Sequence, residues 1–331
     1  MTVPIIIIAG PTAAGKSALA LALAERFNGC IINADSMQVY QESHILSARP
    51  SAKNLLSIPH LLYGHLPINQ ACSVGLWLRW VNDIVTTPKT TKGPVFIVGG
   101  TGLYLHALTK GLAIIPPVPD TIQKETLLLW EQLGPDGFYH KLQQIDSAMA
   151  NRLHPNDRQR LVRALSVYLA TGRSLSDWWD KPHHPIAQKW LGFCLLPERE
   201  QLYKACDQRF LQMMYHGAIE EAQSIYNMHL SPQLPGLGIL GLKRLFAYFD
   251  GTITLDQAIS LSQQDTRNYA KRQITWFTHQ FANATSIRLE NGQSSSELAI
   301  ITMISEKIKF FLDHVGSFQG ASPQYLPGLD G

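Results

Sequence analysis

A glycine-rich segment near the start of the chain has the residue types and spacing of a phosphate-binding loop. It fits G-x-x-x-x-G-K-[ST] at every fixed position and comprises Gly10, Pro11, Thr12, Ala13, Ala14, Gly15, Lys16 and Ser17. In such a loop, backbone N–H groups and the positive end of the following helix hold a di- or triphosphate. Lys16 supplies a positive charge, and the Ser17 hydroxyl is a candidate Mg²⁺ ligand. The pattern predicts a phosphate site more strongly than a turn that only needs glycine.

The customary chemistry of this loop, ATP or GTP hydrolysis, meets a difficulty elsewhere in the sequence. A hydrolase of this class carries an acidic residue for Mg²⁺ at the end of a second core strand. The apolar run 94–98 leads instead into the residues 99–102, Gly-Gly-Thr-Gly, without a carboxylate. A third run, 30–34, ends at Asp35, which could bind metal or act as a base. Spacing alone leaves both roles open.

Two clusters of basic residues fall on segments with helical spacing. Arg160 and Arg163 lie three residues apart, opposite an apolar stripe of Leu161, Leu165 and Leu169. In the second cluster, Arg267 and Lys271 lie four apart and Arg272 follows. Such pairs are more often a solvated helix face than a ligand site. A phosphate loop in the same chain moves that balance modestly toward binding.

The elements that must position these residues belong to the α/β class. The apolar run 4–9 before the loop is typical of a buried parallel strand, and 18–26 after it of a helix. We predict a P-loop NTPase-like parallel sheet flanked by helices, with an all-helical insertion domain. Its parts are a core over 1–118, the helical insertion over 119–188, a return to the core with C-terminal helices over 189–313, and a disordered tail over 314–331. The apolar run 190–196 is typical of a buried strand and indicates the insertion before it, and helices are expected through 203–228 and 256–282.

Composition narrows the class of protein further. No apolar stretch is long enough to cross a bilayer, and the net charge of +3 does not indicate a uniformly basic surface. The four cysteines are dispersed without metal-ligand spacing, so we predict reduced thiols, no zinc, no membrane partner and a cytoplasmic location.

Several sequence blocks together carry a family resemblance. They are the phosphate loop 10–17, Asn-Ala-Asp-Ser-Met-Gln-Val-Tyr at 33–40, Gly-Gly-Thr-Gly-Leu-Tyr at 99–104, His-Pro-Asn-Asp at 154–157 with Gln-Arg-Leu-Val-Arg-Ala-Leu at 159–165, and Ala-Lys-Arg-Gln-Ile-Thr-Trp at 270–276. In this order, the blocks resemble the bacterial tRNA dimethylallyltransferases from residue 4 to about residue 280. Their joint occurrence is far more specific than any one block.

The resemblance implies a reaction and its substrates. The enzyme would transfer a dimethylallyl group from dimethylallyl diphosphate to N6 of adenosine 37 in tRNAs reading codons that begin with U, with Mg²⁺ as cofactor. A monomer is expected. The phosphate loop would then hold the leaving diphosphate rather than ATP, which makes sense of the missing second acid. Asp35 would orient the amine and take its proton.

The resemblance also implies roles for particular residues. Catalytic roles fall to Lys16, Asp35, Thr101 and Arg267, and Arg267 could bind either diphosphate or the tRNA backbone. Contacts with the tRNA anticodon stem-loop fall to Asp35, Ser36, Met37, Gln38, Thr101, Gln123, Gln159, Arg160, Leu161, Val162, Arg163, Lys271 and Arg272. The chain departs from the family pattern at Leu46, Gln123 and Leu242, which puts details of tRNA contact in doubt.

Three other functions compete with this interpretation. An adenylate isopentenyltransferase shares the chemistry but acts on free AMP, ADP or ATP, and the helical insertion with its arginines favours the polynucleotide. A small-molecule P-loop kinase lacks support because the second acid is missing. A nucleic-acid-binding module without activity leaves Lys16, Ser17 and Asp35 unexplained.

Overall fold

Six parallel strands form the sheet of the computed structural model, which describes residues 3–87, 93–180, 185–289 and 297–314. The strands are β1 (Ile5–Ala9), β2 (Cys30–Asn33), β3 (His60–Leu61), β4 (Val95–Gly99), β5 (Trp190–Pro197) and β6 (Thr285–Leu289). Their order is β3-β2-β4-β1-β5-β6, and every neighbouring pair is parallel. The predicted α/β class is confirmed. The predicted tail 314–331 lies, beyond its first residue, outside the described residues.

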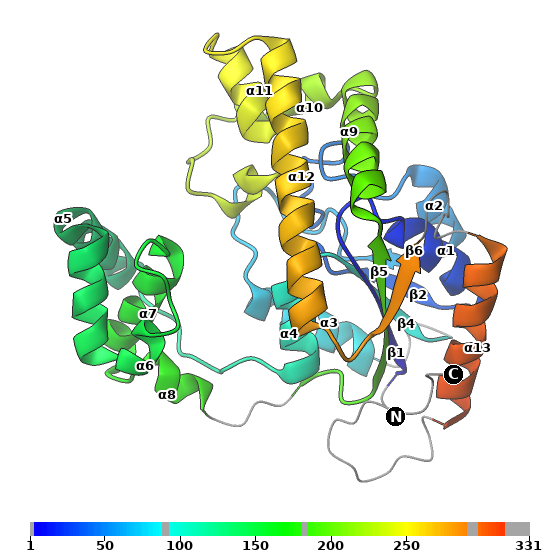
Figure 1. Cartoon of the computed structure of the whole chain (residues 1–331), viewed down its shortest axis with the longest axis horizontal. Coiled ribbons are helices and arrows are strands. Elements are labelled where there is room, and N and C mark those ends of the chain that lie inside the picture. Colours follow the sequence, from blue (N-terminus) through cyan, green and yellow to red (C-terminus); the bar gives the residue numbers. More distant parts are fainter. Residues whose placement is uncertain (1–2, 88–92, 181–184, 290–296, 315–331) are drawn as a thin grey trace. The chain divides into compact units, whose positions relative to one another are not determined.

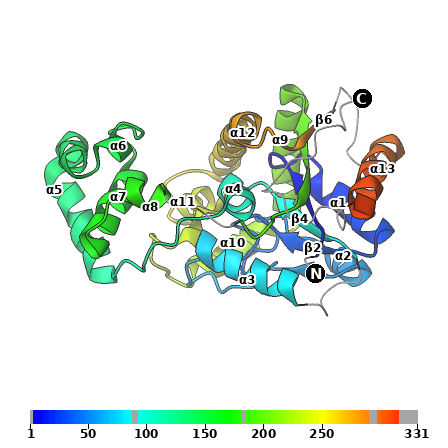
Figure 2. The same cartoon turned by 90° about the horizontal axis from the view of Figure 1, so that it is seen from below.

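Helices cover both faces of this sheet, as parallel strands require. Along β1, Ile6 and Ile8 pack in a core with α1 (Lys16–Arg26) and α13 (Leu298–His314). The alternate residues Ile5 and Ile7 pack in a second core with α3 (Val74–Thr86) and α4 (Gly102–Lys110). Figure 2 shows these two pairs of helices on opposite sides of the strands. The short helix α2 (Ala52–Ser57) follows β2.

A group of helices extends from the sheet and packs around a third core. It consists of α9 (Arg199–Tyr215), α10 (Ala218–Tyr226), the 3₁₀ turn η1 (Pro235–Gly238), α11 (Leu242–Phe249) and α12 (Leu255–Gln280). Helices α9 and α12 run side by side (Figure 1). The sequence predicted helix through 203–228, and the structure divides it: α9 ends at Tyr215, and Gly217, with a φ of 100°, is the N-cap of α10.

The described part of the chain divides into two compact units. One falls within Met1–Thr109 and Ile186–Gly331, and the other is Lys110–Pro185. The second unit is all helical, with α5 (Asp120–Ile145), α6 (Ser147–Ala150), α7 (Arg158–Thr171) and α8 (Leu175–Trp179). It has its own core around Phe138, Leu142 and Leu161. The chain leaves and rejoins the first unit at adjacent points, because Ala187 N–H donates to Leu108 O at 3.1 Å.

The apolar stripe predicted for α7 is correct over its first two members only. Leu161 and Leu165 are fully buried, whereas Leu169 is 46% exposed. Eight residues of a helix rotate the side chain about 80° beyond two full turns, so Leu169 lies off the buried face.

Candidate functional site

The three predicted catalytic segments meet at one edge of the sheet. The phosphate loop follows β1, Thr101 follows β4, and Asp35 follows β2. These strands are neighbours, with Ala9 paired to Gly99 and Asn33 paired to Val98. The carboxyl ends of parallel strands are where α/β proteins bind ligands. Strand order therefore brings together segments far apart in sequence.

The phosphate loop is shaped by glycines at both ends. Gly10 has a φ of 144°, and a Cβ there would lie 2.6 Å from Leu195 O on β5. Gly15 caps α1 in the left-handed conformation. Lys16 Nζ donates to Pro11 O at 2.7 Å. Burial lowers the pKa of Lys16 to about 8, and the negative charge of Asp35 opposes that shift. Ser17 is exposed at the start of α1.

Asp35 lies in a turn fixed by its neighbours. Its N–H donates to Asn33 Oδ1 at 2.8 Å, and Asn33 in turn donates to Leu62 O at 3.1 Å. Asp35 Oδ1 accepts from Met37 N–H at 2.9 Å. Among the described residues, Asp35 Oδ2 has no hydrogen-bond partner, so one carboxylate oxygen is held in place while the second can meet a ligand.

The charge of Asp35 acts on several groups around it. It favours the charged forms of Lys16 and Arg209. Burial first, and the charge of Asp35 second, raise the pKa of Tyr63 and Tyr269 above the usual range, so both phenols stay protonated. Asp35 thus lies opposite the phosphate loop, and the groups around it are the cations Lys16 and Arg209 and the protonated phenols of Tyr63 and Tyr269.

Thr101 connects the strand ends of β4 and β2. Its hydroxyl accepts from Ser36 N–H at 2.9 Å and donates to Ser36 Oγ at 3.3 Å. Its own N–H donates to Ala34 O at 3.2 Å. Thr101 is therefore adjacent to the Asp35 turn and helps to hold it.

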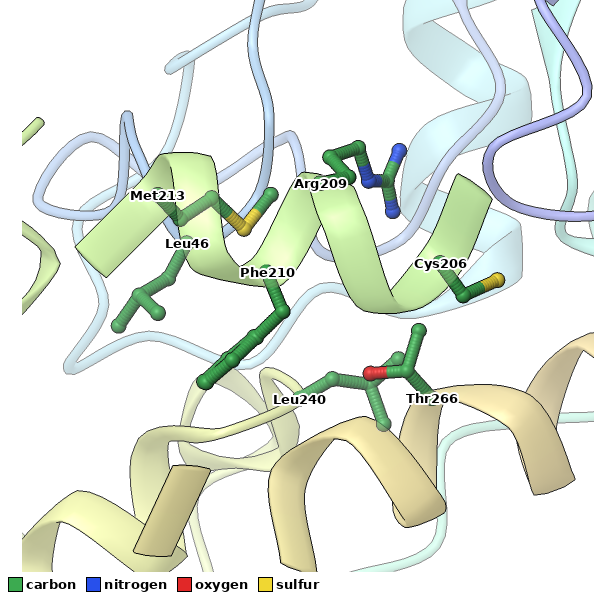
Figure 3. A pocket seen from close by; sticks show the side chains of 7 residues that line it. All are labelled: Leu46, Cys206, Arg209, Phe210, Met213, Leu240 and Thr266. Carbon is green, nitrogen blue, oxygen red and sulfur yellow. The ribbon is translucent and has the colours of Figure 1, made fainter. Parts of the chain in front are cut away.

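Arg209 is a site residue that sequence reasoning missed. It is partly buried on α9, and its guanidinium donates to the Thr12 hydroxyl in the phosphate loop. Burial lowers the pKa of Arg209, and the negative charges of Cys206 and Asp35 oppose that shift. Its side chain borders a small pocket lined also by Leu46, Cys206, Phe210, Met213, Leu240 and Thr266. In Figure 3 the guanidinium points to the side of α9 away from Thr266, whereas Phe210 points toward it.

The sequence predicts that Arg267 binds diphosphate or the tRNA backbone. In the structure, Arg267 contacts an acidic side chain. It lies on α12 and donates to the Asp207 carboxylate on α9. Both Arg209 and Arg267 act on the Cys206 thiol, whose pKa burial raises. Arg267 is therefore near the phosphate loop but paired with an acid. Lys271 and Arg272, farther along α12, are exposed, and the Arg272 guanidinium lies 5.7 Å from the centre of the Tyr269 ring.

The remaining predicted tRNA contacts are in the helical unit and differ in exposure. Gln123 on α5 and Gln159, Arg160 and Arg163 on α7 are exposed. Leu161 and Val162 are buried in the core of the unit, at 0% and 7% exposure, so their side chains face inward and support the helix. Asp157 caps α7 by accepting from Arg160 N–H at 3.3 Å.

The structure shows what surrounds two of the departures from the family pattern, Leu46 and Leu242, and what Gln38 contacts nearby. Leu46 N–H donates to Glu221 on α10 at 2.8 Å, and its side chain lines the pocket beside Arg209. Leu242 is fully buried at the start of α11. Gln38 donates through Nε2 to the carbonyls of Ser47 and Ala48, at 2.8 and 2.9 Å.

Two further findings concern metal and membrane. Within the residues that the structure describes, no three His, Cys, Asp or Glu side chains gather as a metal cluster. No helix in the same residues has the length and apolarity needed to span a bilayer.

A phosphate-loop motif after β1 and a carboxylate after β2, at the carboxyl ends of parallel strands with β4 between them, define a P-loop-like α/β protein. The chain belongs to the IPP transferase family. The family model described as IPP transferase matches residues 38–280, and one described as isopentenyl transferase matches residues 3–70.

Individual relatives agree with this assignment. The chain is 43% identical over 280 residues to a tRNA dimethylallyltransferase of Hyphomonas neptunium, covering 84% of this chain and 89% of the relative. It is 42% identical to that of Rhodospirillum centenum, covering 95% and 98%. A crystal structure of the tRNA isopentenylpyrophosphate transferase from Bacillus halodurans is similar, with a TM-score of 0.67 and 29% identity over 95% of this chain and 98% of that one.

Proposed function

We propose that this protein transfers a dimethylallyl group from dimethylallyl diphosphate to N6 of adenosine 37 in tRNAs reading codons that begin with U. The products are N6-(dimethylallyl)adenosine and diphosphate. Relatives that match most of the chain are named tRNA dimethylallyltransferases. The observation that carries the proposal is the placement of Asp35 opposite the phosphate loop, with its charge acting on Lys16.

The phosphate loop and two cations would hold the diphosphate of the donor. Loop N–H groups, Lys16 and Arg209 surround the place where negative charge grows as the C1–O bond of the allylic substrate breaks. Losing one such donor commonly raises the barrier by about 3 kcal/mol. No water needs activation, so a second acid of the hydrolase type has no task.

Asp35 would prepare the nucleophile. The exocyclic amine of adenine is a weak nucleophile because its lone pair is delocalised into the ring. As the N6–C1 bond forms, N6 must lose one proton, and Asp35 Oδ2 can accept it while Met37 N–H holds Oδ1. The electron pair of the C1–O bond leaves with diphosphate, so the step balances without another reactant.

Mg²⁺ is a fitting cofactor for this set of donors. Mg²⁺ is commonly bound by one or two protein oxygens together with substrate phosphates and water. The exposed Ser17 hydroxyl offers such an oxygen at the start of α1, and Mg²⁺ bound there would neutralise diphosphate charge.

Residues of each unit would contact the acceptor tRNA. Adenosine 37 stacks within the anticodon loop and must be extruded to expose N6. Asp35, Ser36, Met37, Gln38 and Thr101 would surround the extruded base, with Lys271 and Arg272 beside them. Gln123, Gln159, Arg160 and Arg163 would hold the stem-loop, mainly through phosphates. Because tRNA is the substrate, we place the enzyme in the cytoplasm, and we expect a monomer.

A labelling assay tests the proposal. Dimethylallyl diphosphate labelled in its hydrocarbon is offered with unmodified tRNA, with AMP, and alone, each with Mg²⁺. We expect label in tRNA at adenosine 37 and none in AMP. Label in AMP but not in tRNA would identify an adenylate isopentenyltransferase instead. Consumption of ATP without prenyl transfer would identify a kinase.

A further inference from the structure

A buried glutamine on α12 joins the two halves of the site. Gln273 is 6% exposed and lies on the buried face of the helix, among Ala258, Ser262, Thr266, Ala270 and Phe277. An uncharged amide in such a place must have hydrogen-bond partners, or burial would destabilise the fold. Neither partner of this amide belongs to α12.

The two ends of the amide contact different loops. Gln273 Oε1 accepts from Thr12 N–H at 2.8 Å, inside the phosphate loop. Gln273 Nε2 donates to Gly100 O at 2.8 Å, directly before Thr101. Both bonds span long sequence separations, 261 and 173 residues. One side chain therefore bridges the loop after β1 and the loop after β4.

From Gly100 the connection continues to the predicted base. Thr101 follows Gly100, binds the Ser36 N–H through its hydroxyl, and donates its own N–H to Ala34 O. Ser36 is the next residue after Asp35. The leaving-group loop and the carboxylate are thus linked through Gln273, Gly100 and Thr101.

A side chain at Gly100 would force the Gln273 amide to move. A Cβ on Gly100 would lie 2.3 Å from Gln273 Nε2 and 3.0 Å from Gly10 O. A glycine before Thr101 therefore leaves the space that the Gln273 amide occupies.

We propose that Gln273 is a positioning residue for prenyl transfer: its amide fixes the distance between the phosphate loop and the Asp35–Thr101 segment. This inference rests on the proposed function and adds a residue to which no substrate contact is assigned. The donor carbon and the acceptor nitrogen must approach in line, and a displacement of about 1 Å can lower a rate about 100-fold. Lys16 and Arg209 make their own contacts with the phosphate loop, at Pro11 O and at the Thr12 hydroxyl, so we expect binding of either substrate alone to depend little on Gln273.

The test compares Gln273→Met with the full-length wild-type enzyme. Methionine fills similar space without either hydrogen bond. We expect kcat for transfer to tRNA to fall between about tenfold and 100-fold, with the Kd values of inorganic diphosphate and of tRNA changed by less than about threefold. Gln263→Met is the matched control. Gln263 is on the same helix and donates to Asp207 O at 3.2 Å, on α9 rather than on either loop. That variant should keep its kcat.

Gly100→Ala provides a second route to the same break. Its methyl group would displace the Gln273 amide from Gly100 O, so kcat should fall similarly. In the double variant with Gln273→Met, the two losses of kcat should be far from additive, because each substitution alone removes the same contact between Gln273 and Gly100. If Gln273→Met folds poorly, the effect of Gly100→Ala alone on kcat still tests the proposal.

Four results would count against the inference. An unchanged kcat in Gln273→Met, or additive losses in the double variant, would overturn the positioning role. An equal loss of kcat and of diphosphate affinity would assign Gln273 to binding. If the wild-type enzyme moved no label to tRNA while still binding diphosphate, the proposed function would fail, and this inference with it.

Discussion

At the scale of single residues, Asp35 is the group whose role can be separated most cleanly from its structural contacts. Asp35→Asn keeps an oxygen to accept from Met37 N–H, so the turn should persist. It removes the proton acceptor, and we expect kcat to fall about 100-fold or more. Single-turnover transfer and tRNA binding are the measurements. Full activity of Asp35→Asn would reject the base assignment.

The two arginines near the phosphate loop should differ in effect. Arg209 contacts Thr12 in the loop, whereas Arg267 is paired with Asp207. We expect Arg209→Ala to lower kcat/KM for the donor by about 100-fold, and Arg267→Ala to have a smaller effect on the donor. Steady-state kinetics at varied concentrations of dimethylallyl diphosphate measure kcat/KM for the two variants. A larger loss in Arg267→Ala would restore the role predicted from sequence.

Lys16 should make diphosphate binding depend on pH. Its pKa is lowered to about 8, so the ammonium form that attracts an anion is lost as the pH rises through about 8. We expect diphosphate affinity to fall by up to about tenfold per pH unit above that value. Lys16→Arg is the control, because arginine stays charged and its profile reports ionisation of the ligand alone. Parallel wild-type and Lys16→Arg profiles would exclude this titration.

Sequence predicted those site residues that follow strands, and missed those delivered by distant helices. Lys16, Asp35 and Thr101 each lie in a short motif after an apolar run, so parallel strand order alone can bring them together. Arg209 and Gln273 reach Thr12 from 197 and 261 residues away. The helix of Arg209 shows only amphipathic spacing, and although Gln273 lies in the family block 270–276, a buried glutamine carries no sign of its partners. Only the packing of α9 and α12 reveals them.

At the scale of elements, α7 combines a binding face with a supporting face. Arg160 and Arg163 are exposed, while Leu161 is fully buried between them. We expect Arg160→Ala with Arg163→Ala to weaken tRNA binding roughly tenfold or more and to reduce the slope of log Kd against log salt by about 2. Titrations at several salt concentrations measure both quantities.

Two comparisons make this result specific. Arg158→Ala is the matched control, because Arg158 is on the same helix and its ion pair with Glu131, at 2.8 Å, is closer than that of Arg160 with Asp157, at 3.5 Å. We expect Arg158→Ala to change the slope of log Kd against log salt less than the double arginine variant does. Leu161→Ala should instead lower the free energy of unfolding by about 2–5 kcal/mol through the cavity it leaves. An unchanged salt slope in the double arginine variant would place the tRNA contacts elsewhere.

The elements themselves were largely predictable, with errors where helices end. Buried strands of isoleucine and valine were clear in β1 and β4, and the return to strand at β5 marked the helical insertion. The break at Gly217 was missed because glycine inside an amphipathic run gives no direct sign of a positive φ. The exposed Leu169 was missed because a stripe over two turns drifts around the helix.

At the scale of the whole molecule, the division into two units predicts that donor binding and tRNA binding can be separated. The chain leaves the first unit after α4 and returns before β5, where Ala187 N–H donates to Leu108 O. A short Gly-Ser linker from Lys110 to Ile186 can therefore replace the helical unit without stretching the sheet. The phosphate loop, Arg209 and Gln273 all stay in the remaining unit.

The shortened protein should bind inorganic diphosphate with the affinity of the full chain and transfer no label to tRNA. Calorimetry with diphosphate and a tRNA gel shift, each beside the full chain, measure the two properties. Diphosphate binding serves as the internal control for folding, because the loop is formed by strand order and long-range contacts. If the shortened protein bound tRNA as tightly as the full chain, the exposed cations of α12 rather than those of α7 would carry recognition.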